Sequence, residues 1–353
     1  MAKRIIQVIL LLLILTTAVL SYRIYRELMM PITPANNPTI IEIPDGASRD
    51  MVFRRLYAKK IIAHEWPLRI YVMLTTSGDK IKAGEYEFSS PASPLDVLSK
   101  LKEGGRPLRR LTIIEGWDRW DISVAMARVP EFKLSSVDEA IGLMNETSEI
   151  RDLDPNAKNL EGYLFPDTYS YDSNTSPGEF IAGMVRQFKQ EWNKKFATLA
   201  REKKMSVHDV VTIASIVETE VKLNEERPLA ASVIFNRLKK QMPLGVDSSV
   251  IYAAKLNGIW KNDRKVYQSY LDLKSPYNSR INTDLPPGPI SSPGVRSIEA
   301  TLNPATSNYL YYVRDPERDD GLHKFYDSEA DFARGVEALR QWESQRDGAA
   351  RVK

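Results

Sequence analysis

The sequence Ala214-Ser215-Ile216-Val217-Glu218-Thr219-Glu220 places a carboxyl group inside the apolar face of a helix that should be buried. At about 100° per residue along a helix, Glu218 falls between Ala214 and Val211 on that face. Burial disfavours the charged form of a carboxyl group, and a carboxylic acid that stays protonated near neutral pH can act as a general acid. Glu218 is therefore the candidate catalytic residue. The alternative is a structural glutamate held by an arginine.

The helix that carries Glu218 has a clear start. Ser206 with Asp209 three residues later has the form of a capping box, which predicts a helix over Val207–Glu220. A second long helix is predicted near residues 178–199, where large apolar side chains recur at helical spacing. Such a stripe is typical of a hydrophobic core rather than a cofactor site, and its members are Phe180, Met184, Phe188, Trp192 and Phe196.

The N-terminus carries a candidate membrane segment. Residues 5–22 are uncharged, follow Lys3 and Arg4, and are just numerous enough to cross a bilayer core. A cleavable signal peptide is the alternative, but residues 18–21 form a poor cleavage site and the apolar run is longer than a usual signal core. We therefore expect a cytoplasmic tail at residues 1–4 and a transmembrane helix at 5–22. The remainder would lie outside the inner membrane of a bacterium.

The composition excludes several classes of site. The chain has 353 residues and no cysteine, so it has neither disulfides nor a Cys-ligated metal. Its histidines, His64, His208 and His323, are far apart and show no His-x-x-x-His spacing, which argues against a zinc enzyme. We expect no metal and no cofactor. The formal net charge of +3 is small for this length and argues against nucleic acid as the main partner.

The chain divides into segments of different pattern. Residues 23–39 contain Pro31, Pro34 and Pro38 and are expected to form a juxtamembrane linker. Residues 40–114 read as a small domain with strands near 40–43, 83–88 and 108–114 and helices between them. A connecting region at 115–159, a main domain at 160–343 and a flexible tail at 344–353 follow. The predicted fold class is α+β, with a mainly helical main domain and short strands near 309–313.

Seven segments of the main domain occur in the order typical of one family. They are LEGYLFPDTY (160–169), ASIVETE (214–220), ERPLAASVIFNRL (226–238), VDSSVIYA (246–253), SPYN (275–278), LPPGPI (285–290) and LNP (302–304). In these motifs the chain resembles the YceG-like family, the endolytic murein transglycosylases. The anchor and the small domain, which is similar to a LysM module, also lie where that family has them.

The resemblance implies an enzyme that cuts the MurNAc–GlcNAc bond within nascent peptidoglycan and leaves a 1,6-anhydro-MurNAc end. The family's catalytic glutamate falls on Glu218. This residue would first protonate the glycosidic oxygen and then take the proton of the sugar's 6-hydroxyl as that group closes on C1. The acetamido group of MurNAc would help stabilise the cationic centre, so a second, nucleophilic carboxylate is not required. The implied partners are glycan strands, the inner membrane and cell-wall synthesis proteins such as penicillin-binding proteins.

Other polar and aromatic residues of these motifs are candidates for a sugar groove, through hydrogen bonds to hydroxyl groups and stacking on rings. Asn236 with Arg237 could instead be a structural pair, and Asp247 could cap a helix at Val250. His323 with Phe325 resembles the family's late His-x-Phe element, and a surface histidine is the alternative. The expected substrate-binding residues are Glu161, Asp167, Asn236, Arg237, Asp247, Tyr252, Tyr277, Asn278 and His323.

The chain departs from the family pattern at four positions. Thr219 replaces a lysine, Asp284 a glycine, Arg280 an aromatic residue and Phe332 a late histidine. None of these changes removes the proposed acid, so they bear on contacts with the substrate rather than on the reaction.

Other functions stay open at this point. A muramidase would use Glu218 as acid and Asp247 as a second carboxylate that guides water, and would leave reducing ends. A non-catalytic scaffold would bind glycan through residues 40–114 and recruit synthases. A lyase with a lysine-bound pyridoxal cofactor is disfavoured by the membrane anchor.

Overall fold

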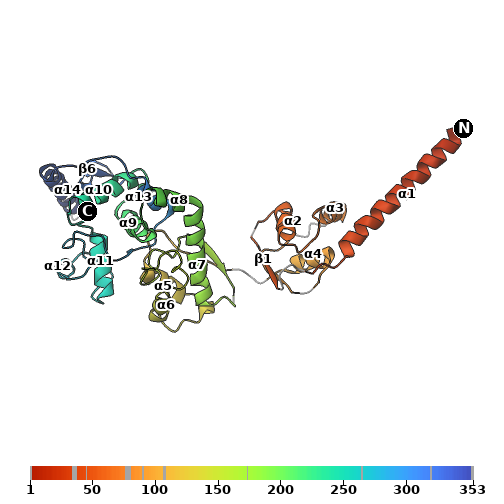
Figure 1. The fold of residues 1–353 in the computed structure, drawn as a ribbon, viewed down its shortest axis with the longest axis horizontal. Helices are drawn as coiled ribbons and strands as arrows, with labels where there is room; N and C mark the ends of the chain where they lie inside the picture. Colours follow the sequence, from red (N-terminus) through yellow and green to blue (C-terminus); the bar gives the residue numbers. More distant parts are fainter. Residues whose placement is uncertain are drawn as a thin grey trace. The chain divides into compact units, whose positions relative to one another are not determined.

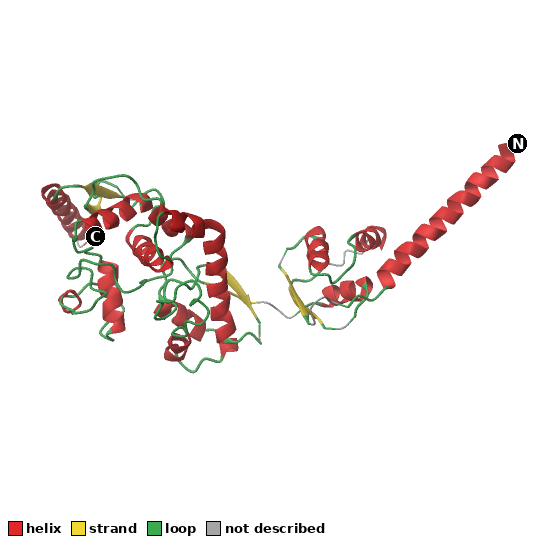
Figure 2. Cartoon of the chain, viewed as in Figure 1, coloured by secondary structure: helices red, strands yellow, loops and turns green. Residues whose placement is uncertain are grey.

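The structure is a computed structural model. It describes residues 2–33, 38–44, 46–75, 81–89, 91–105, 109–172, 174–263, 265–318 and 320–350. The chain forms two compact units, Met1–Arg109 and Arg110–Lys353. In the described ranges both units are rich in helix and carry a few short strands, as the predicted α+β class requires (Figure 2).

The first unit is built around one antiparallel strand pair. Strand β1 alternates buried and exposed side chains, and Thr39 at its start lies opposite Phe88 at the end of β2. Two helices connect the strands along the chain, and a third follows β2 (Figure 1). The elements are α1 (Ala2–Met29), β1 (Thr39–Ile43), α2 (Arg49–Ala58), α3 (Trp66–Thr75), β2 (Gly84–Phe88) and α4 (Pro94–Glu103).

The linker expected at residues 23–39 differs from the structure in its first part. Helix α1 continues to Met29 because its last turns have an apolar side that packs on the small domain, where Leu28 is buried and Ile24 contacts the same cluster. Ile32 then exchanges backbone hydrogen bonds with Ala92 at 3.0 and 3.2 Å. Residues 34–37 lie outside the described part of the chain. The apolar helix is thus attached directly to the first unit.

The second unit holds the remaining elements, among which β3 pairs with β4 and β5 pairs antiparallel with β6. Their bounds are β3 (Arg109–Thr112), α5 (Arg119–Ala127), the 3₁₀ helix η1 (Pro130–Phe132), α6 (Val137–Leu143), β4 (Thr168–Tyr171), α7 (Pro177–Glu191), the π-helix η2 (Trp192–Phe196), α8 (Ala197–Glu202), α9 (Val207–Glu220), α10 (Arg227–Lys239), α11 (Asp247–Leu256), α12 (Gln268–Leu271), α13 (Val295–Leu302), β5 (Tyr311–Arg314), β6 (His323–Tyr326) and α14 (Glu329–Ala350).

Helix α9 is the central element of the second unit. It begins as predicted, with the Ser206 hydroxyl accepting the backbone N–H of Asp209 at 3.0 Å. One side of the helix, with Val211 and Ala214, packs in the same cluster as the α7–η2 aromatic stripe, which is buried as expected. The other side packs in a second cluster with α10 and α11, through residues such as Val217. The last turn of α9 carries Glu218, Thr219 and Glu220.

Three predicted boundaries differ from the structure. The strand expected at 108–114 belongs to the second unit, because β3 pairs with β4. The connecting region expected at 115–159 contributes Ile122 and Met144 to the same core cluster as α9, so it is part of that unit. The tail expected to be flexible from 344 is helical through Ala350 as the end of α14.

Three motifs that are far apart in sequence meet at one glycine. Gly162 of the LEGYLFP segment has a φ of +82°, and a Cβ atom placed on it would lie 2.6 Å from Pro289 and 2.7 Å from Val211. Pro289 belongs to LPPGPI, and Val211 belongs to α9. A side chain at position 162 would clash with the side chains of Pro289 and Val211, so this close packing requires glycine.

We predict that Gly162→Ala lowers the free energy of unfolding by about 2–4 kcal/mol, because it adds both a left-handed backbone strain and an overpacked methyl group. Urea denaturation of the full chain measures the change. The matched control is Gly178→Ala in the first turn of α7, where a Cβ meets nothing within 4 Å and stability should change little. An unchanged midpoint for Gly162→Ala would contradict this packing.

Candidate active site

The Glu218 carboxyl group is fixed by three donors from two other helices. The Gly294 backbone N–H and the Ser297 hydroxyl both donate to Glu218 Oε2, at 2.9 and 2.8 Å. Arg227 Nη2 lies 3.0 Å from Glu218 Oε1. The side chains of Glu218 and Arg227 are only 5 % and 6 % exposed, so this is a buried ion pair. We define these four residues as the Glu218 clamp.

Local sequence places each donor of the clamp. Gly294 is the N-cap residue of α13 and Ser297 lies in its first turn, where backbone and side-chain donors point beyond the helix end. Arg227 is the first residue of α10, next to Pro228. Its guanidinium also donates to Ser297 Oγ and, through Nε, to Asn224 Oδ1 at 3.1 Å. The clamp therefore ties the ends of α9, α10 and α13 together.

Both sequence-based interpretations of Glu218 describe part of this geometry. The residue lies at the end of a buried helix, as predicted, and it is held by an arginine, which was the structural alternative. Arg227, Gly294 and Ser297 were not among the predicted site residues, although Arg227 lies within the ERPLAASVIFNRL segment.

A second carboxyl group, Glu115, lies beside the clamp and was also missed. Its loop is fixed by two backbone hydrogen bonds, from Gly116 N–H to the Ser292 carbonyl at 2.8 Å and from Ser292 N–H to the Trp117 carbonyl at 2.7 Å. A Cβ on Gly116 would be 3.6 Å from Glu218 Cγ. Burial and the nearby charge of Glu218 raise the pKa of Glu115, against the opposing effect of Arg227.

Several residues predicted to bind sugar are instead internal. Glu161 is fully buried and accepts hydrogen bonds from Tyr252 Oη at 3.0 Å and from the Arg119 backbone N–H at 3.2 Å. Burial, with the charge of Asp118, raises the pKa of Glu161 to about 8. Tyr252 packs edge-on against Trp120 with 5.5 Å between ring centroids. These partners make Glu161 and Tyr252 core groups rather than surface contacts.

Asn236, Arg237 and Asn278 hold loops. Asn236 Nδ2 donates to the carbonyls of residues 307 and 309, both at 2.9 Å. Arg237 donates to the carbonyls of residues 243, 244 and 310, which fits the structural pair that the sequence left open. Asn278 is fully buried and donates to the carbonyls of residues 271 and 273. Their amide and guanidinium groups are engaged by backbone, so they shape the fold around α10 and α11.

Asp247 does not cap a helix at Val250. It is the first residue of α11, whose N-cap is Val246. Its exposed carboxylate pairs with Arg280, whose Nε lies 3.1 Å from Oδ1. Arg280 is one of the departures from the family pattern, so the altered residue supplies the partner of Asp247.

The three remaining predicted residues, Asp167, Tyr277 and His323, differ in how exposed they are. Asp167 is exposed beside β4, and its Oδ1 accepts the Thr168 N–H at 2.7 Å. Tyr277 is half-buried, and burial raises its pKa to about 12. His323 is not a free surface histidine, because its Nδ1 lies 3.0 Å from Oε2 of the buried Glu226. The structure thus brings together Glu218 and its clamp, but it does not gather all nine predicted residues around it.

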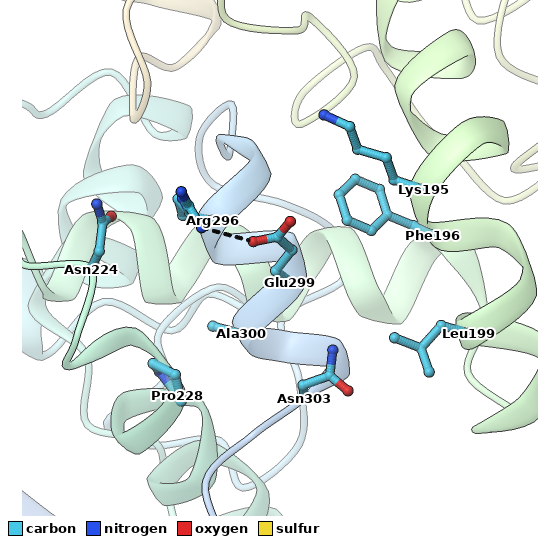
Figure 3. A pocket seen from close by; sticks show the side chains of 9 residues that line it. All are labelled: Lys195, Phe196, Leu199, Asn224, Pro228, Arg296, Glu299, Ala300 and Asn303. Atoms are coloured by element: carbon cyan, nitrogen blue, oxygen red, sulfur yellow. Dashed lines mark hydrogen bonds and ion pairs between the residues drawn. The ribbon is translucent and has the colours of Figure 1, made fainter.

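A cavity of about 420 Å³ lies against α13. Figure 3 shows its mixed lining, in which Arg296 pairs with Glu299 at 3.4 Å. Ser297, the α13 side chain that contacts Glu218, is not among the lining residues. The cavity is therefore beside the clamp rather than built on it. Among the described residues no group of three or more His, Asp or Glu side chains is arranged to hold a metal ion.

Comparison with known proteins identifies the family of this chain. The model of the YceG-like family matches residues 41–338. The chain belongs to the YceG-like family. It is 32 % identical over 302 residues to a Bacillus subtilis protein named endolytic murein transglycosylase, with 82 % of each chain covered. A Streptococcus pneumoniae D39 protein of the same name is 29 % identical over 322 residues, which cover 84 % of this chain and 58 % of that protein.

A solved structure agrees with this family assignment. A YceG-like protein of Listeria monocytogenes is 31 % identical in sequence and superposes with a TM-score of 0.57. The match covers 84 % of this chain and 98 % of that one.

One ionic network joins the start of α9 to the LPPGPI segment in this YceG-like chain. His208 Nδ1 lies 2.8 Å from Asp154 Oδ2, and His208 Nε2 lies 2.9 Å from the Pro287 carbonyl oxygen. Two acceptors facing both ring nitrogens favour the protonated ring. The hydrogen bond that His208 donates to Asp154 raises the pKa of His208, and it outweighs the opposing effect of burial. Burial raises the pKa of Asp154, but hydrogen bonds donated by His208 and Tyr163 outweigh this effect and lower the pKa below its usual value.

We predict that this pair contributes about 1–2 kcal/mol of stability, which depends on pH. The stability contributed by His208 is fully present below about pH 6.5, the pKa of its side chain in the unfolded chain. It is lost as pH rises through the higher pKa of His208 in the folded chain. The stability contributed by Asp154 is present above about pH 4, the pKa of its side chain in the unfolded chain. It is lost as pH falls through the lower pKa of Asp154 in the folded chain. Urea midpoints of the parent and His208→Gln should therefore differ most near pH 5–6 and converge near pH 9. His64→Gln is the control, and a difference independent of pH would contradict the prediction.

Proposed function

We propose that this chain is an endolytic peptidoglycan lytic transglycosylase and that Glu218 is its general acid and then its general base. The observation that carries the proposal is the Glu218 clamp, which fixes one carboxyl group at the end of the ASIVETE helix. The names of the B. subtilis and S. pneumoniae relatives support the substrate class. The reaction breaks the bond between C1 of MurNAc and O4 of GlcNAc and leaves a 1,6-anhydro-MurNAc end.

The hydrogen bonds of the clamp select one oxygen of Glu218. A carboxylate oxygen accepts about two hydrogen bonds. Oε2 receives both Gly294 N–H and Ser297 O–H, whereas Oε1 receives Arg227 alone. We therefore assign the proton transfer to Oε1. The proton leaves Oε1 for O4 as the C1–O4 bond breaks, and Oε1 then takes the proton of the 6-hydroxyl as O6 bonds to C1. The starting protonation state is restored, and no water is consumed.

The first unit supports an anchored, glycan-binding role. Among the described residues, one helix, Gln7–Met29, is long and apolar enough to cross a membrane, and its apolar window is unburied. The unit then runs β1, α2, α3, β2 with the strands antiparallel. We propose that it is a LysM-like module. We propose a single-pass inner-membrane protein whose second unit is periplasmic and works beside penicillin-binding proteins and other synthesis proteins.

This topology predicts the outcome of proteolysis. Protease added outside the inner membrane should release peptides that contain Glu218 while the first residues stay protected. Protection of the Glu218 peptides would place the second unit in the cytoplasm, where no peptidoglycan exists, and would contradict the proposal.

We predict that Glu218→Gln lowers the rate of glycan cleavage by roughly 10²–10⁴-fold, because an amide cannot donate an acidic proton. The assay digests isolated glycan strands and measures released fragments by mass spectrometry, with the thermal midpoint as a test of folding. Glu299→Gln is the control, since it removes a carboxylate of the same unit from an exposed ion pair.

Two outcomes would overturn this proposal. If Glu218→Gln is folded and cleaves as fast as the parent, Glu218 is structural. If the parent releases reducing ends instead of ends one water lighter, the enzyme is a muramidase and the assignment of the 6-hydroxyl as nucleophile is wrong.

A further inference from the structure

Glu115 and Glu218 are anchored on the same residue. Glu218 Oε2 accepts the Gly294 N–H at 2.9 Å. The Cα atom of Gly294 is bonded to that nitrogen. A Cβ built on this Cα would lie 1.9 Å from Glu115 Oε1, so the Glu115 oxygen lies against the Gly294 Cα. Covalent bond lengths around Gly294 then place the two carboxylate oxygens within about 8 Å of each other. Two carboxyl groups no farther apart than this can act on the same glycosidic bond.

The two carboxyl groups differ in exposure. Glu218 has a side chain that is 5 % exposed. Glu115 is an exposed residue in the loop that precedes α5. Gly116 has a φ of +81°, and this left-handed turn brings the Glu115 loop against Glu218. Glu115 is thus the member of the pair that solvent and a glycan strand can reach.

We propose that Glu115 is the second carboxyl group of the active site and that it shares one proton with Glu218. The inference rests on the proposed function and adds a positioning residue to it. The charged groups that act on Glu115 are Glu218 from α9 and Arg227 from α10. With one proton on the pair, the two carboxyl groups and the single guanidinium are neutral together. With no proton, they carry one net negative charge in a partly buried site, which is unfavourable.

This arrangement solves a chemical difficulty of the clamp. Glu218 accepts hydrogen bonds from Gly294 and Ser297 and pairs with Arg227, but a general acid must begin the reaction with a proton. The neighbouring charge of Glu115 opposes the loss of the last proton from the pair. The raised pKa of Glu115 agrees with this coupling.

The test is the pH dependence of glycan cleavage by the full chain in detergent micelles. We expect Glu115→Gln to move the alkaline limb of the rate profile about one pH unit lower, which lowers the rate about tenfold above that limb. Gly294→Ala should move it in the same direction, because the added methyl group displaces the Glu115 carboxyl group while the Gly294 N–H is kept. Glu299→Gln should leave the limb in place.

The outcomes separate this inference from the proposed function. If the parent makes no anhydro ends, the proposed function fails. If the parent makes them and folded Glu115→Gln has the parent's alkaline limb, the shared proton is wrong and Glu115 is only a loop residue. If Glu115→Gln has a lowered thermal midpoint or no measurable rate, Gly294→Ala takes its place in the test. An alkaline limb at lower pH than the parent's then supports the shared proton, and an unchanged limb contradicts it.

Discussion

The buried ion pair between Arg227 and Glu218 is the interaction on which the second unit depends. Two charges removed from water are stable only with good geometry and further hydrogen bonds. The structure supplies these through Gly294, Ser297 and Asn224. Removal of one partner of such a pair typically costs about 3–5 kcal/mol, because the other charge is left buried. The pair therefore joins the end of α9 to the starts of α10 and α13.

The segment that runs from LPPGPI into the first turn of α13 carries the Gly294 and Ser297 donors to Glu218. Ser215 on α9 fixes it, because its hydroxyl accepts the Ile290 N–H at 3.0 Å and its carbonyl accepts the Ser291 hydroxyl at 3.1 Å. The Pro287 carbonyl meets His208 at the other end of the same helix. A single buried helix thus positions both its own carboxyl group and the loop that holds it. This is why motifs separated by more than 70 residues act as one site.

The sequence was sufficient to predict α9 and the place of Glu218 on it, because helix periodicity and capping are local signals. It did not reveal Gly294 or Glu115, because their roles depend on a steric fit between distant backbones. Asn236 and Asn278 were predicted to bind sugar because they are polar residues of a motif. The sequence does not distinguish a polar side chain that binds substrate from one that donates hydrogen bonds to the backbone. Prolines suggested a linker from residue 23, but the apolar side of α1 near Leu28 continues the helix onto the small domain.

The central claim is that glycan is cleaved at the Glu218 clamp and not in the cavity beside α13. The most direct measurement is a crystal structure of the full-length Glu218→Gln variant with a bound glycan fragment. The account predicts a glycosidic oxygen within hydrogen-bond distance of the substituted side chain at position 218, with Glu115 on the same side of the sugar. A fragment bound only in the cavity lined by Lys195 and Glu299, without contact to position 218, would contradict it.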